Sequence, residues 1–316
     1  VTRGFQVRAL VRDESRAHRT LGELAADIEI LVGDFCEPQV AATAVAGQHY
    51  VINCAAAVGH GRQSVFTQVN VEALRMWAHE LAVSRSLKRF VHLSSLGVYP
   101  LKDHFGTDEQ APLNAGIDDY TASKVASENL IKQFVPQLPY TILRPGFIYG
   151  PGDRQVVPRL VQRLRRGMVP YVDGGLYKLN NTFVGNVVAA IFQAMCCPEA
   201  ERQTFNITDS RLVSRKEFFE VVAQGLGLPA PKWSVPRRLL QLATPVAIRL
   251  QQWLAKSAGE DPFLSPAVMK FLAFNLEFST AKARRVFGYA PPFEFDEGMA
   301  LALAAIHKEG GAGEPT

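Results

Sequence analysis

The sequence predicts an α/β protein built on a doubly wound parallel sheet, and three observations lead to this prediction. Short apolar runs alternate with longer helical segments over the first 150 residues. The runs are almost continuously apolar, which indicates strands that are buried on both faces. The segments between them repeat apolar residues every three or four positions, as helices that cover such a sheet do. Ligands of these sheets bind at the carboxyl ends of the strands, so we expect the chemistry directly after each strand.

Each element of this fold has its own sequence pattern. The expected strands are Phe5–Val11, Ile28–Val32, Tyr50–Ala57, Arg89–Leu93 and Tyr140–Leu143, and the helices between them include Val69–Ser84 and Asp119–Val135. From residue 151 proline and glycine become frequent, and the expected helices are Val187–Met195, Arg215–Gly225 and Pro236–Lys256. This organisation predicts a sheet domain over 1–150, a smaller and mostly helical substrate part over 151–309, and a disordered tail over 310–316.

Composition excludes several classes of protein. The 316 residues are 47% hydrophobic and 20% charged, which excludes disorder as the main state. No stretch approaches the roughly 18 unbroken apolar residues of a membrane span. The net charge of +4 is not gathered into a basic stripe, so nucleic-acid binding is not expected. The four cysteines, Cys36, Cys54, Cys196 and Cys197, form no metal or disulfide framework. This usage favours a reducing, cytoplasmic setting, and no metal site is predicted.

A Tyr-x-x-x-Lys pair, Tyr120 and Lys124, lies in the predicted helix 119–135. The four-residue spacing puts both side chains on one helix face. An ammonium beside a phenol lowers the pKa of the phenol, so the tyrosine can exchange a proton with a carbonyl or alcohol oxygen. A surface tyrosine with a solvated lysine would show the same spacing. The strand before the helix ends at Ser94 and Ser95, and a hydroxyl there can bind the same substrate oxygen, which makes the combination more specific.

With these motifs the chain resembles an extended short-chain dehydrogenase/reductase of the NAD-dependent epimerase/dehydratase superfamily. The likeness is greatest to the branch of 3β-hydroxysteroid dehydrogenases and dihydroflavonol reductases, and segment 262–289 resembles the C-terminal region of that branch. The resemblance implies that residues 1–150 form a Rossmann-like NAD(P)-binding domain. The matching stretches include VINCAAA (51–57), VNVEAL (69–74), RFVHLSSLGVYP (89–100), YTASK (120–124), TILRPGFIYGPGD (141–153) and FNITDS (205–210).

The resemblance also implies a role for each matching residue of the catalytic centre. Ser95, Tyr120 and Lys124 would form the proton-transfer triad, in which Tyr120 is the acid/base. Lys124 would also bind the nicotinamide ribose. Ser94 would lie near the nicotinamide, and Asn70 would support the active-site helix.

Other matching residues are expected along the dinucleotide. They follow successive strands of the predicted sheet, where small side chains let the cofactor approach the backbone. Simple core packing is the alternative explanation of the alanines, but their place at the carboxyl end of a strand favours the cofactor. The residues are Asp34 and Phe35 at the adenine, Cys54, Ala55 and Ala56 along the dinucleotide backbone, and Pro145 beside the nicotinamide.

The end of strand 5–11 bears on the choice of cofactor. NAD-specific relatives carry an acidic residue there, which binds the ribose 2′-hydroxyl. This chain has Val11 followed by Arg12, and a guanidinium can bind a 2′-phosphate. The sequence therefore favours NADP(H). The alternative is that Arg12 is solvated and Asp13 takes the acidic role, with NAD as cofactor.

The glycine-rich turn that the family places between its first strand and first helix is absent from the printed sequence. The start, VTRGFQV, resembles the end of that first helix running into the second strand. A strand–turn–helix unit of about 25 residues would be lacking. The lacking strand would be central in the sheet, so we expect the chain as written neither to fold alone nor to bind a dinucleotide without that unit.

The expected function is reversible reduction of a ketone to a secondary alcohol on a hydrophobic substrate, such as a sterol, an acyl ketone or a flavonoid. Helix 236–256 has one apolar face and a basic complement, which fits an ordinary packed helix, a lid or a membrane-surface contact. A sugar-nucleotide epimerase or dehydratase is the first alternative, and a non-catalytic dinucleotide sensor is the second. Intact Tyr120 and Lys124 argue against the sensor. Assembly into a homodimer stays open.

Overall fold

The computed structural model describes residues 3–59, 62–154, 156–240, 242 and 266–311. It confirms the α/β class and the parallel arrangement of the strands. Four parallel strands form the main sheet in the order β10 (Gln203–Ile207), β6 (Tyr140–Pro145), β4 (Arg89–Leu93) and β3 (Tyr50–Asn53). Because β10 follows residue 151, this sheet draws on both stretches of the chain that the sequence separates.

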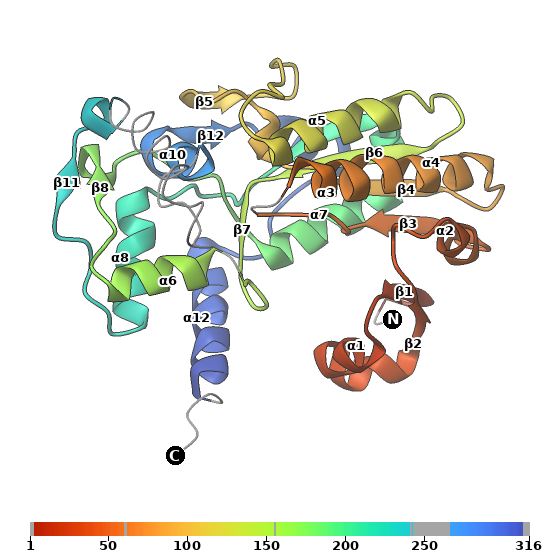
Figure 1. Ribbon diagram of the computed structural model, residues 1–316, viewed down its shortest axis with the longest axis horizontal. Coiled ribbons are helices and arrows are strands. Elements are labelled where there is room, and N and C mark those ends of the chain that lie inside the picture. Colours follow the sequence, from red (N-terminus) through yellow and green to blue (C-terminus); the bar gives the residue numbers. More distant parts are fainter. Residues whose placement is uncertain (1–2, 60–61, 155, 241, 243–265, 312–316) are drawn as a thin grey trace.

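Helices cover both faces of the main sheet (Figure 1). Phe90 and Ile142 point to the face that holds α2 (Pro38–Val45), α4 (Leu74–Val83) and α5 (Asp119–Lys132). Val91 and Leu143, their neighbours along the strands, point to the face that holds α7 (Val184–Cys196) and α11 (Ala281–Phe287). Side chains alternate along a strand, so burial of both sets explains why these strands read as continuous apolar runs.

The helix expected over 69–84 begins earlier and is not uniform. It consists of α3 (Gln63–Thr67), a π-helical turn η2 (Gln68–Ala73) and α4. A π-helical turn adds one residue to a helical turn and is frequent at functional sites. Here it lies next to α5, which carries the Tyr-x-x-x-Lys pair.

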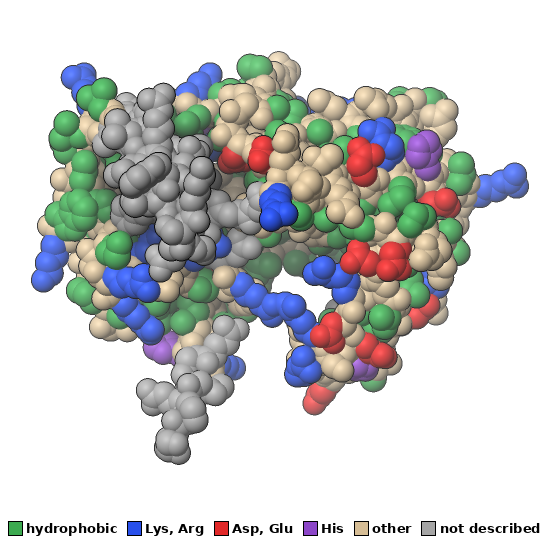
Figure 2. Space-filling view, in the orientation of Figure 1, with side chains coloured by type: hydrophobic (Ala, Val, Ile, Leu, Met, Phe, Trp, Pro, Cys, Tyr) green, Lys and Arg blue, Asp and Glu red, His purple; other side chains and the backbone are tan. Residues whose placement is uncertain are grey.

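The first two strands form a sheet of their own, separate from the main sheet. β1 (Val7–Val11) pairs with β2 (Ile28–Val32), and their connection is α1 (Glu14–Leu21) with the short 3-10 helix η1 (Gly22–Asp27). Within the described residues neither strand pairs with β3. A cavity of about 960 Å³ lies between β1 and β3, and Ile52 of β3 is 44% exposed. Figure 2 shows an open notch between the lobe that holds β1 and β2 and the C-terminal part of the chain, bordered mainly by Lys and Arg side chains.

The remaining chain combines helices with short parallel strand pairs, beside the carboxyl edge of the main sheet (Figure 1). The helices are α6 (Val157–Arg165), α8 (Arg215–Gly225), α10 (Pro266–Ala273) and α12 (Phe295–Gly311). The strand pairs are β5 (His104–Thr107) with β12 (Leu276–Phe278), β7 (Phe147–Tyr149) with β9 (Asn181–Phe183), and β8 (Tyr171–Val172) with β11 (Ser234–Val235). Short 3-10 turns are η3 (Leu96–Val98), η4 (Asp173–Gly175) and η5 (Pro198–Ala200).

The helix expected over 236–256 and the tail expected over 310–316 are only partly within the described residues. Of the helix expected over 236–256, residues 237–240 and 242 are helical, and 241 and 243–256 lie outside the described residues. The expected disordered tail starts too early, because α12 continues through Gly311. Residues 312–316 lie outside the description. No helix in the described ranges is long and apolar enough to cross a membrane.

Candidate active site

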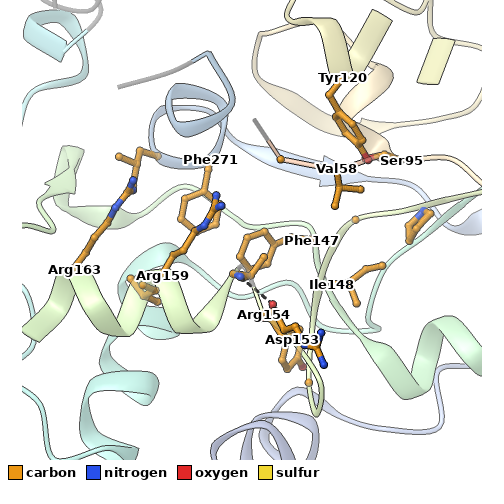
Figure 3. Close-up of a pocket in the computed structure, with 18 of the residues that line it drawn as sticks. Val58, Ser95, Tyr120, Phe147, Ile148, Asp153, Arg154, Arg159, Arg163 and Phe271 are labelled. Atoms are coloured by element: carbon orange, nitrogen blue, oxygen red, sulfur yellow. Dashed lines mark hydrogen bonds between the residues drawn. The ribbon is translucent and has the colours of Figure 1, made fainter. Parts of the chain in front are cut away.

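Ser95 and Tyr120 meet at the carboxyl edge of the sheet. Ser95 follows β4, and Tyr120 lies in the first turn of α5, whose N-cap Asp118 accepts a hydrogen bond from the Thr121 amide at 2.7 Å. The Tyr120 phenol forms a hydrogen bond with the Ser95 side chain. Ser95 Oγ also accepts from the Gly97 amide at 2.9 Å, so a backbone bond fixes the serine. Figure 3 shows the two side chains facing each other at the wall of a cavity.

Lys124 lies one helical turn after Tyr120 and is buried. Its Nζ donates to the carbonyl of Leu93, the last residue of β4, at 2.9 Å. Burial lowers the pKa of Lys124 to about 8. Burial also raises the pKa of Tyr120 to about 12, while the Ser95 hydrogen bond acts to lower it. The structure thus differs from the expectation that Lys124 lowers the tyrosine pKa, because the ammonium turns toward the strand end.

Asn70 of η2 is hydrogen-bonded to α5, the helix that carries the Tyr-x-x-x-Lys pair. Its side chain donates to Ser123 Oγ of α5 at 2.9 Å and to the Ala57 carbonyl at 3.1 Å. Its Oδ1 accepts from the Ala57 amide at 2.7 Å. The π-helical turn aims this buried amide at both the segment after β3 and α5. Asn70 therefore connects the segment after β3 with α5.

Ser94 lines the same cavity, but its hydroxyl points away from it. Ser94 Oγ donates to Oε1 of Glu128 at 2.6 Å, and Glu128 is fully buried on α5. The sequence pattern indicated that Ser94 is near the chemistry. It gave no signal for the partner, because Glu128 is 34 residues away in the chain.

The residues expected at the adenine lie on the β1–β2 side of the division. Asp34 Oδ1 accepts from the Cys36 amide at 2.8 Å. Phe35 stacks on Trp77 of α4 with ring centroids 4.9 Å apart, so its ring is a packing contact. Arg12 is exposed directly after β1, whereas Asp13 caps α1 by accepting from the Arg16 amide at 2.9 Å. The capping bond gives Asp13 a local structural role.

The small residues after β3 lie between the residues expected at the adenine and those expected at the nicotinamide. Asn53 Oδ1 accepts from the Ala55 amide at 2.9 Å and holds the chain as it leaves the strand. Cys54 and Ala55 border the cavity between β1 and β3. Ala56 is partly exposed, and Pro145 ends β6 beside Ser94 and Ser95 in the other cavity.

In the arrangement that the resemblance implies, the nicotinamide end of a dinucleotide would lie at Lys124, Tyr120 and Pro145, and the adenine end at Asp34 and Arg12. Between them the described residues offer small side chains after β3 and the open gap beside β1. A dinucleotide spans the carboxyl edge of such a sheet, so these residues would hold it along that edge.

A cavity of about 900 Å³ opens from Tyr120 toward the C-terminal part and is mainly apolar. Phe147 and Ile148 of β7 and Phe271 of α10 form apolar walls (Figure 3). Three arginines also line it: Arg154 before α6, and Arg159 and Arg163 on α6. The sequence reading missed these residues. Four-residue spacing of Arg159 and Arg163 on a helix was a signal that both share one face.

A parallel sheet with a serine at a strand end and a Tyr-x-x-x-Lys helix beside it defines an extended short-chain dehydrogenase/reductase. The family described as "NAD dependent epimerase/dehydratase family" matches residues 2–208. This match covers more than half of the chain, so the chain belongs to that family. It is an NAD(P)-dependent enzyme of the extended short-chain type.

Similar sequences include oxidoreductases of ketones and steroids. The chain is 30% identical to a 3-beta-hydroxysteroid dehydrogenase of Mycolicibacterium neoaurum, covering 95% of this chain and 84% of that protein. It is 28% identical to a 2-alkyl-3-oxoalkanoate reductase of Stenotrophomonas maltophilia (strain K279a), covering 95% and 91%. It is also 28% identical to the uncharacterized protein YbjS of Escherichia coli (strain K12), covering 98% and 92%.

Solved structures share the fold. The crystal structure of gox2253 superposes with a TM-score of 0.77 at 23% identity, covering 98% of this chain and 92% of that one. A UDP-glucuronic acid 4-epimerase from Bacillus cereus, in complex with UDP-glucuronic acid and NAD, gives a TM-score of 0.75 at 14% identity, covering 97% and 92%. At these identities the likeness concerns the fold.

Proposed function

We propose that the protein is an NADP(H)-dependent oxidoreductase that interconverts a ketone and a secondary alcohol on a hydrophobic substrate. The observation that supports this most is the place of the Tyr120–Ser95 pair, at the mouth of a largely apolar cavity of about 900 Å³. A cavity of this size and lining suits a sterol-sized or long-chain ketone. The relatives named for a steroid and for an alkyl-oxoalkanoate are consistent with that class.

The residues divide the proton chemistry between them. With a pKa raised to about 12, Tyr120 keeps its proton at neutral pH and is a proton donor for a ketone oxygen. Ser95, fixed by the Gly97 amide, orients the same oxygen by a hydrogen bond. Lys124 places a positive charge one turn behind the tyrosine. NADP(H), when bound, supplies or accepts the hydride.

The preference for NADP(H) rests on the end of β1. Arg12 is exposed there, and the acidic residue next to it, Asp13, is engaged as the N-cap of α1. An exposed guanidinium can bind a 2′-phosphate through charge-assisted hydrogen bonds. The Asp13 carboxylate, which could otherwise bind a free 2′-hydroxyl, already accepts a hydrogen bond from the Arg16 amide.

A nucleotide-sugar epimerase is the second candidate, and one observation favours it. This observation is the presence of Arg154, Arg159 and Arg163 at the cavity, because guanidinium groups also bind a diphosphate. The apolar segment 236–256 is a poor source of diphosphate ligands, but α6 is not. The apolar walls formed by Phe147, Ile148 and Phe271 favour the oxidoreductase over this alternative.

A substrate panel distinguishes the two candidates. The protein is expressed with the family's first strand, glycine-rich turn and helix placed before Val1. It is mixed with NADPH and apolar ketones, including a 3-oxosteroid and a 2-alkyl-3-oxoalkanoate, and with UDP- and dTDP-sugars without added reductant. We expect NADPH consumption with at least one apolar ketone and no change in the sugars. Epimerised sugar with no net use of NADPH would overturn the proposal and establish the second candidate.

A further inference from the structure

A buried ion pair lies directly behind the proposed catalytic residues. Glu128 of α5 and Arg144 of β6 are 0% and 2% exposed. Arg144 donates through Nε to Glu128 Oε1 at 2.8 Å and through Nη2 to Oε2 at 2.6 Å, a two-point contact. Ser94 Oγ donates to the same Oε1 at 2.6 Å. We call Glu128, Ser94 and Arg144 the Glu128 clamp.

The clamp joins α5 to the carboxyl ends of β4 and β6. Each of its three residues lies next to a residue proposed to act at the reaction site. Ser94 immediately precedes Ser95, and Arg144 immediately precedes Pro145. Glu128 lies one helical turn after Lys124, which itself bonds the Leu93 carbonyl at 2.9 Å. Two bonds on successive turns of α5 thus hold the end of β4. The Ser94 amide donates to the Leu143 carbonyl at 2.8 Å, so β6 is held to the same point.

The clamp extends by one more contact on the far side. Arg144 Nη1 donates to Tyr99 Oη at 2.7 Å, and Tyr99 Oη donates to Asn206 Oδ1 of β10 at 2.8 Å. Tyr99 follows the turn that begins at Ser95. The segment after β4 is therefore held at both of its ends by the same arginine–glutamate pair.

We infer that Glu128 is a positioning residue, which sets Tyr120 and Lys124 against Ser95 by fixing α5, β4 and β6 to one another. This inference rests on the proposed function. Removing one partner of a buried ion pair leaves an unpaired charge and lowers the stability of the fold. Replacing both partners by apolar residues of similar size often leaves the stability of the fold unchanged. Fold stability alone therefore does not require this pair, whereas the alignment of three strand and helix ends does need a directional contact.

The test compares variants of the clamp with a matched control on the same strand. Glu128→Met combined with Arg144→Met removes both charges together, and Ser94→Ala removes a single hydrogen bond. Arg89 at the other end of β4 is also buried and donates to Thr141 Oγ1 at 2.9 Å and to the Cys197 carbonyl at 3.1 Å. Arg89→Met is the control, because it disturbs a buried hydrogen-bonded charge away from the site.

Turnover is measured with NADPH and the panel ketone that the wild-type chain reduces fastest. We expect kcat to fall about 100-fold in the double variant and about tenfold in Ser94→Ala, with KM for the ketone and Kd for NADPH within about threefold. Arg89→Met should lower Tm and leave kcat within about twofold. Wild-type kcat in a folded double variant would overturn the inference, as would an equal loss of kcat in the Arg89 control.

Two further measurements separate this inference from the proposed function. Tyr120→Phe is assayed in parallel: if it turns over normally, the proposed function is wrong, whereas an inactive Tyr120→Phe with normal clamp variants refutes the inference alone. A crystal structure of the double variant tests the same claim without turnover. The expected result is a displacement of Tyr120 Oη from Ser95 Oγ by roughly 1 Å, and an unchanged pair would contradict it.

Discussion

The two sides of the divided sheet show opposite degrees of constraint. On the β4–β6 side both strands are paired on both edges, their side chains are buried on both faces, and hydrogen-bonded charges hold the strand ends. On the β1–β2 side each strand has one described partner, and β1 is half-buried throughout. The β1–β2 sheet contacts the rest of the chain through Phe35, which stacks on Trp77 of α4. It also contacts α2 through Arg8, whose Nη1 donates to the Thr43 carbonyl at 3.0 Å.

This difference separates two tasks. Proton transfer needs groups held within a fraction of an ångström, and the residues proposed for it lie on the fully packed side. Arg12 and Asp34, the residues proposed for cofactor recognition, lie on the side that borders the cavity of about 960 Å³. Substitutions on the β4–β6 side should therefore lower kcat, whereas substitutions on the β1–β2 side should weaken cofactor binding.

The largest effect is expected from Tyr120→Phe on the packed side. The substitution removes only the phenol oxygen, so the proton donor is lost while the ring contact with Phe66 remains. We expect kcat for ketone reduction to fall by roughly two to four orders of magnitude, with little change in Tm. Steady-state kinetics and thermal unfolding measure both quantities. A variant with near-normal kcat would remove Tyr120 from the mechanism.

Substitution of one isoleucine in the packed part of the sheet and of one beside the gap compares how much each contributes to the free energy of unfolding. Ile142 of β6 is fully buried, whereas Ile52 of β3 is 44% exposed beside the gap. Ile142→Ala should lower the free energy of unfolding by about 2–5 kcal/mol, because it leaves a cavity in a packed core. Ile52→Ala should cost less than about 1 kcal/mol. Denaturant unfolding of both variants measures the difference, and equal losses would show that the gap side is as tightly packed as the other.

Arg12 tests the cofactor side. Arg12→Ala should raise the Kd for NADPH about 10- to 100-fold and leave that for NADH nearly unchanged, because only the 2′-phosphate differs. The reason is the loss of charge-assisted hydrogen bonds to that phosphate. Fluorescence titration with each cofactor gives the two constants. Equal weakening of both would show that Arg12 does not bind the phosphate.

The smallest effect concerns pH and Lys124. Its folded-state pKa is about 8, below the ordinary 10.5, so the unfolded chain binds more protons between these values. Stability from this group therefore rises with pH from about 8 upward. Lys124→Met should reduce the gain in unfolding free energy between pH 7.5 and 9.5 by about 1–2 kcal/mol. An identical gain in the variant would mean that Lys124 does not titrate there.

Much of the fold follows from local pattern. Ile28–Val32 and Arg89–Leu93 were predicted with their observed bounds, because strands buried on both faces have an unbroken apolar signature. The places of Ser95, Tyr120 and Lys124 follow from strand ends and helical spacing in the same way. The Glu128–Arg144 contact could not be predicted, since it depends on how α5 crosses β6. The cavity walls formed by β7, α6 and α10 likewise depend on tertiary packing.

Transfer of deuterium from NADPH distinguishes reduction of a ketone from epimerisation of a sugar. NADPH labelled with deuterium at the transferable C4 position is incubated with the protein used in the substrate panel and the ketone that it reduces. We expect one deuterium on the carbinol carbon of the alcohol, found by mass spectrometry, and none in the Tyr120→Phe reaction over the same time. Nucleotide sugar that is epimerised without label from the added cofactor, with no labelled alcohol from any apolar ketone, would contradict it.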